Sequence, residues 1–144
     1  MTNFNIDLRS DTITKPTKTM LEYMFNAKVG DDVWEEDETV KDLESFLASL
    51  FSKDAALFCP SGTMTNQIAI RVHTKMGDEL ICDRLAHIYN YEGGGVASNS
   101  GVSVRLVDGK FGCISLAQIK SNINPDDVHF PRTRLVCLEN TVNK

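Results

Sequence analysis

One apolar run that turns directly into a helical pattern constrains the fold of this chain more than any other stretch. Residues 55–59 (AALFC) are typical of a buried strand, and residues 60–62 (PSG) predict a sharp turn after it. Apolar residues then recur at every fourth position, as along one face of a helix: Met64, Ile68, Val72 and Met76. A strand, a turn of small residues and a helix form the repeating unit of α/β folds.

The start of this predicted helix suits an anion. A helix N-terminus exposes backbone N–H groups and carries partial positive charge. Gly62 permits close approach of the backbone, and Ser61 and Thr63 add hydroxyl groups. The turn predicts either a cup for a phosphate group or an ordinary N-cap, in which a hydroxyl oxygen satisfies the first helical N–H groups. The sequence has neither the lysine of a Walker loop nor a dinucleotide-binding fingerprint.

Strand and helix patterns alternate along the rest of the chain. Helices are predicted over residues 16–26, 39–51, 64–76 and 115–122, and further strands over residues 79–83, 102–107 and 134–140. This alternation favours an α/β fold with a mainly parallel sheet. Ligands bind such sheets at the carboxyl ends of strands, so we expect residues 61–63, His87 and Glu139 at one edge. Three consecutive glycines, 93–95, predict a flexible break or close approach to a ligand.

Charge and cysteine usage exclude several classes of protein. The 144 residues have a formal net charge of −5 and no basic run, which argues against binding nucleic acid or an anionic membrane surface. The first residues lack the pattern of a signal peptide, and no run is long enough to span a bilayer. Four widely spaced cysteines, without a CxxC pair, favour reduced thiols over disulfides or a zinc site. We therefore expect a cytoplasmic protein without a bound metal.

Two polar segments have both a structural and a functional interpretation. Residues 9–12 (RSDT) are a dense polar group near the N-terminus, which a solvated, locally capped tail would also explain. His87 follows the predicted strand 79–83, where either a structural or a catalytic histidine fits.

Five motifs, in order and at matching spacing, resemble those of the low-specificity L-threonine aldolases: residues 7–12 (DLRSDT), 29–33 (VGDDV), 60–66 (PSGTMTN), 86–89 (AHIY) and 138–141 (LENT). These are lyases that depend on pyridoxal 5′-phosphate (PLP) and have the fold of aspartate aminotransferase. The resemblance implies an α/β, three-layer, mainly parallel sheet, the fold type I large domain, incomplete here. It also implies two parts: residues 1–35 as an arm, short helix and acidic loop, and residues 36–144 as the N-terminal part of the PLP-binding domain.

The resemblance implies roles for four residues. Gly62 and Thr63 would hold the phosphate of PLP through backbone N–H and hydroxyl groups. His87 would stack on the pyridine ring, and it is the catalytic residue that we expect. Ser10 would donate a hydrogen bond to the carboxylate of the amino-acid substrate.

The implied reaction is the retro-aldol cleavage of L-threonine or L-allo-threonine to glycine and an aldehyde. PLP supplies the electron sink, and the protein supplies orientation and electrostatics. The resemblance further implies a homotetramer for the full-length protein. Three alternatives remain in view: a β-eliminating lyase of the same fold type, an inactive truncated remnant, and a nucleotide-phosphate binding module.

The chain departs from the family in three respects. Val142 stands where many members have a histidine that faces the substrate hydroxyl, and Trp34 stands where tyrosine is common. Family members are more than twice as long, so the Schiff-base lysine, the aspartate for the pyridine nitrogen and a substrate-binding arginine are expected beyond residue 144. We therefore expect an N-terminal fragment whose strand 55–59 lacks a partner, and which folds poorly and is inactive alone.

Overall fold

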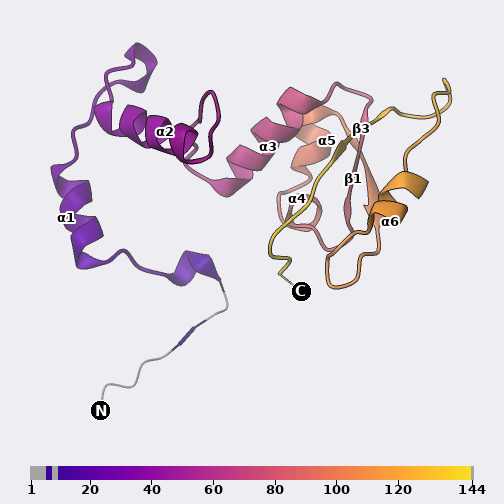
Figure 1. The fold of residues 1–144 in the computed structure, drawn as a ribbon, viewed down its shortest axis with the longest axis horizontal. Helices are drawn as coiled ribbons and strands as arrows, with labels where there is room; N and C mark the ends of the chain where they lie inside the picture. The colour runs from indigo at the N-terminus through magenta and orange to yellow at the C-terminus, as the bar shows by residue number, and fades with distance from the viewer. Residues whose placement is uncertain (1–5, 8–9, 144) are drawn as a thin grey trace. The chain divides into compact units, whose positions relative to one another are not determined.

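The computed structural model describes residues 6–7 and 10–143, and only the backbone of Asp11. Residues 8–9 of the first motif lie outside this description. The chain divides into two compact units, Met1–Phe58 and Cys59–Lys144, and each is described by itself (Figure 1). The boundary predicted between residues 35 and 36 stays a prediction. Within the described ranges, no helix is long and apolar enough to cross a membrane.

Two α-helices dominate the first unit: α1 (Lys18–Asn26) and α2 (Glu38–Leu50), accompanied by the short 3-10 helices η1 (Asp11–Ile13) and η2 (Asp32–Trp34). The side chain of Asp37 caps α2 by accepting a hydrogen bond from the backbone N–H of Val40 at 2.9 Å. Thr39 instead donates its hydroxyl to the carbonyl of Lys28 at 2.6 Å. Neither α1 nor α2 contains a buried residue.

A three-stranded parallel sheet forms the centre of the second unit. Its strands are β1 (Glu79–Asp83), β2 (Ser103–Val107) and β3 (Thr133–Val136), in the order β2-β1-β3. The helices of this unit are α3 (Gly62–His73), α4 (His87–Asn90), α5 (Gly95–Ser100) and α6 (Leu116–Ser121). This arrangement confirms the predicted α/β class with a parallel sheet (Figure 1).

The central strand β1 is buried along its whole length. Leu80 and Cys82 have no exposed surface, and they pack with Ile70 of α3 and Val96 of α5. The apolar run at residues 80–82 therefore predicted this strand correctly, because a strand with a neighbour on each side and a core against it has no solvent-facing position.

The predicted strand at residues 55–59 is wrong. No strand forms there, and the side chains of Leu57 and Phe58 are 67% and 51% exposed. A strand needs a neighbour for its backbone hydrogen bonds, and none of the described strands pairs with this run.

The predicted apolar stripe of the following helix is also wrong. In α3 the buried residues are Gln67 and Ile70, whereas Val72 is 68% exposed and Met76, beyond the helix, is 80% exposed. The four-residue spacing selected the wrong face because the buried face of α3 includes a polar residue.

Burial sets the chemistry of the cysteines, all four of which are free. Burial raises the pKa of Cys82 to about 12 and that of Cys137 to about 11. Cys113 is exposed.

We expect iodoacetamide at pH 8 to alkylate Cys113 and to leave Cys82 and Cys137 unmodified. The thiolate is the reactive form, and a thiol whose pKa lies far above the pH is almost entirely protonated. Peptide mass spectrometry after timed quenching measures the rates, and the urea-unfolded protein, in which all four cysteines react, is the control. Labelling of Cys82 in the folded protein as fast as Cys113 would contradict this assignment.

Candidate functional site

The turn that precedes α3 forms one of the two features predicted for it, the N-cap, and the phosphate cup stays a prediction. The hydroxyl oxygen of Ser61 accepts a hydrogen bond from the backbone N–H of Met64 at 3.1 Å, which is an ordinary N-cap. Among the described residues, no partner is found for the backbone N–H groups of Gly62 and Thr63 or for the Thr63 hydroxyl. Both residues are exposed, and no atom lies within 4 Å of the position a Cβ would take at Gly62. The first turn of α3 therefore has donors without a described partner on two exposed residues.

His87 begins α4, four residues beyond the end of β1. Its backbone N–H donates to the Oε2 atom of Glu139 at 2.7 Å. Glu139 follows β3, the parallel neighbour of β1. The prediction that these two residues share one edge of the sheet is confirmed.

A buried carboxylate connects His87 to α3. The side chain of Glu92 has no exposed surface, and its Oε1 atom lies 2.9 Å from Nδ1 of His87. From α3, the amide of Asn66 donates to Oε1 at 2.7 Å and that of Gln67 donates to Oε2 at 2.6 Å. The residue that supplies the ring and the helix that supplies the free N–H groups thus bind the same carboxylate.

Sequence reasoning did not single out Glu92. Its partners on α3 lie 25 and 26 positions away, so no local pattern links them. The one available signal is its place between His87 and the three glycines, in a loop that has little other charge.

Gly95 makes a close approach, but to the protein itself and not to a ligand. A Cβ at this position would lie 2.6 Å from Cδ of Gln67. The amide of Gln67 is fixed there, because its Nε2 donates to Glu92 and its Oε1 accepts from Asn99 at 3.2 Å. The missing side chain lets α5 pack against α3 over this amide.

The structure leaves the predicted substrate-binding residue in the other unit. Ser10 belongs to Met1–Phe58, where its hydroxyl oxygen accepts from the backbone N–H of Thr12 at 3.2 Å and lies 2.9 Å from the Thr12 hydroxyl. Local capping of the segment is therefore present, and the role of Ser10 toward a substrate stays a prediction.

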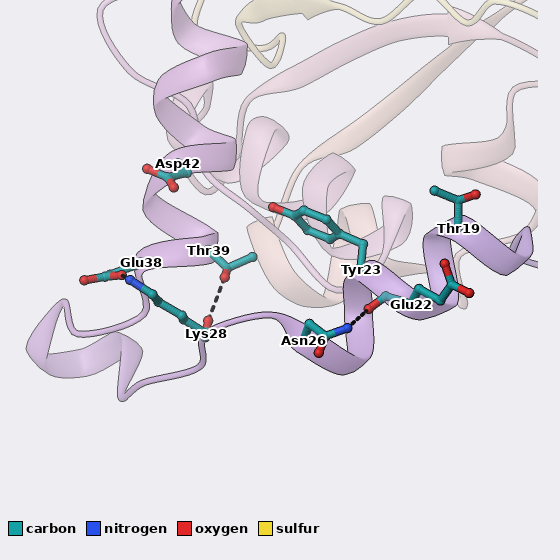
Figure 2. Close-up of a pocket in the computed structure, with 8 residues that line it drawn as sticks. All are labelled: Thr19, Glu22, Tyr23, Asn26, Lys28, Glu38, Thr39 and Asp42. Atoms are coloured by element: carbon teal, nitrogen blue, oxygen red, sulfur yellow. Dashed lines mark hydrogen bonds and ion pairs between the residues drawn. The ribbon is translucent and has the colours of Figure 1, made fainter.

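A cavity of about 520 Å³ also lies in the first unit (Figure 2). Its lining consists of Thr19, Glu22, Tyr23, Asn26, Lys28, Glu38, Thr39 and Asp42. Lys28 binds Glu38 across it at 2.6 Å, and this pairing raises the pKa of Lys28 and lowers that of Glu38. Both side chains are well exposed, so the pair has the character of a surface ion pair. None of the predicted site residues lines this cavity.

Comparisons with known proteins agree with the motifs. The family model described as beta-eliminating lyase matches residues 7–144. The chain is 45% identical, over 96% of its length, to the low specificity L-threonine aldolase of Escherichia coli strain K12. It is likewise 45% identical, over 94% of its length, to the probable low-specificity L-threonine aldolase 2 of Arabidopsis thaliana. The chain spans 42% and 39% of the lengths of these two relatives.

A solved structure of Leishmania major threonine aldolase resembles this chain in fold. The TM-score is 0.68, with 82% of this chain and 34% of that chain covered, at 23% sequence identity. At this identity the likeness establishes the α/β fold alone.

We expect Gly95→Ala to lower the free energy of unfolding by about 1–3 kcal/mol, the usual cost of overpacking. The new methyl group would displace the Gln67 amide from Glu92 and Asn99. Urea unfolding measures the change. Gly62→Ala is the matched control, since open space surrounds that position. An equal effect of the two substitutions would show that the contact with Gln67 is unimportant.

Proposed function

Because the chain belongs to the beta-eliminating lyase family, we propose that the protein is a PLP-dependent lyase that cleaves L-threonine and L-allo-threonine to glycine and an aldehyde. One observation carries the proposal: α3, whose first turn has free N–H donors, binds through its Asn66 and Gln67 side chains the same buried carboxylate as His87. The names of the relatives from Escherichia coli and Arabidopsis thaliana support the choice of substrate.

The described residues fit the two ends of the cofactor. PLP carries a phosphate group and a flat pyridine ring. The free N–H groups of Gly62 and Thr63, at the positive end of α3, suit a phosphate. His87 suits the ring, because one edge of its imidazole is bound to Glu92 while 38% of its side chain stays exposed.

The resemblance gives four residues of the chain a part in this mechanism. When bound, PLP supplies the electron sink for cleavage of the carbon–carbon bond. Gly62 and Thr63 would hold the phosphate, and His87 would stack on the pyridine ring and orient it. Ser10 would hold the carboxylate of the amino acid.

Val142 gives no proton acceptor at the position where many family members carry a histidine. Its methyl groups pack toward Gly112, where they would collide with any added Cβ. The group that takes the proton of the substrate hydroxyl is therefore supplied from elsewhere, and His87 or a water molecule would serve.

The resemblance extends the proposal to the assembly and its location. We infer that the full-length protein acts in the cytoplasm as a homotetramer, with the small amino acid as its partner. The second candidate function is β-elimination, which the description of the matching family favours.

The decisive experiment uses the protein at its natural length, loaded with PLP and given L-threonine. Glycine and acetaldehyde support the proposed function, whereas pyruvate and ammonia from a β-substituted amino acid, without glycine release, support β-elimination. Neither set of products would support the inactive remnant.

We expect Thr63→Val to weaken PLP binding by about tenfold or more, since hydrogen bonds to charged groups contribute about 1.5–3 kcal/mol. Equilibrium dialysis measures the affinity. Thr65→Val is the matched control, because the Thr65 hydroxyl donates to the Ser61 carbonyl within the helix at 3.2 Å. Equal losses in the two variants would contradict a phosphate contact at Thr63.

A further inference from the structure

Glu92 is a fully buried carboxylate whose described partners are two amides and an imidazole. A buried charge is tolerated only when its oxygens are well supplied with donors. Asn66 and Gln67 supply one N–H each, at 2.7 Å and 2.6 Å. The Gln67 amide lies with its oxygen toward Nδ2 of Asn99 and its NH₂ group toward Glu92.

These contacts determine the protonation of His87. Both oxygens of Glu92 already accept hydrogen bonds, so the carboxylate meets Nδ1 of His87 as an acceptor. Nδ1 then carries a proton, and in the neutral ring this makes Nε2 the nitrogen with the lone pair. Glu139 fixes the backbone of the same residue at 2.7 Å, so Glu92 sets the remaining freedom, which is the rotation of the ring.

We propose that Glu92 is a positioning residue for His87. It fixes the Nδ1–H tautomer and the direction of the ring. Through its hydrogen bond with Asn66 it also connects the ring to α3, just after the first turn of that helix. The use of this arrangement for PLP rests on the proposed function; the arrangement itself does not. The donors of Gly62 and Thr63 and the ring of His87 are then held in one fixed arrangement, which exists before the cofactor binds.

The first test is the tautomer of His87 in the cofactor-free protein at its natural length. ¹⁵N chemical shifts of labelled histidines, assigned with His87→Gln, distinguish Nδ1–H from Nε2–H. We expect Nδ1–H in the wild type and a mixture of tautomers in Glu92→Ala. A wild-type His87 protonated on Nε2, or one that Glu92→Ala leaves unchanged, would overturn the proposal. If Glu92→Ala does not fold, the wild-type measurement decides.

The chain offers a matched control for this experiment. Asp127 lies 2.8 Å from Nδ1 of His129, but both side chains of that pair are exposed. Asp127→Asn should leave the spectrum of His87 and the affinity for PLP unchanged.

The second test separates positioning from general structural support. Glu92→Ala should weaken PLP binding by about tenfold, the lower end of the loss seen when a metal-bound histidine loses its hydrogen-bond partner. The affinity of this variant for inorganic phosphate should stay the same, because phosphate alone contacts only the start of α3 at Gly62 and Thr63. Equal losses for both ligands would assign Glu92 a structural role and refute the proposal. If the wild type binds no PLP, the proposed function fails, while the tautomer still decides on Glu92.

Discussion

The candidate site depends on the burial of one charge. Removing a carboxylate from water costs several kcal/mol, and the cost is offset only when its hydrogen-bond donors are all in place. Glu92 therefore couples the positions of its neighbours: α3 must present Asn66 and Gln67, and His87 must turn its Nδ1 atom inward. Gly95 belongs to the same constraint, because any side chain there would occupy the space of the Gln67 amide.

The sequence predicted those parts of the fold that local patterns determine. The strand at residues 79–83 was predicted at its observed bounds, because its three middle residues are apolar, as a central strand with a neighbour on each side requires. The helix at 115–122 was predicted to within a residue at each end, because Ser115 caps it and Gln118 completes the capping box. The sequence also predicted that His87 lies at the same edge of the sheet as Glu139, because the carboxyl ends of parallel strands share an edge. The hydrogen bond between the two residues agrees with this prediction.

Errors arose where structure depends on residues distant in sequence. Residues 55–59 have the composition of a strand, but composition does not supply a neighbouring strand. In α3 the apolar Val72 faces outward while Gln67 is buried, because a hydrogen bond to a residue 25 positions away outweighs the polarity of the amide. Glu92 was missed for the same reason. The sequence shows that it is acidic, and only the folded chain shows that it is enclosed.

The N-cap and the phosphate cup, which compete as interpretations of the sequence, are compatible in the structure. A helix start leaves four N–H groups without an intrahelical acceptor. The Ser61 hydroxyl satisfies one of them, that of Met64, and the N–H groups of Gly62 and Thr63 are among those left without a partner in the described part of the chain. A cap of this kind even favours an anion, because it fixes the backbone of the turn while leaving the foremost donors free. The presence of a capping serine is therefore no argument against a ligand at the same helix start; the number of donors left after capping decides.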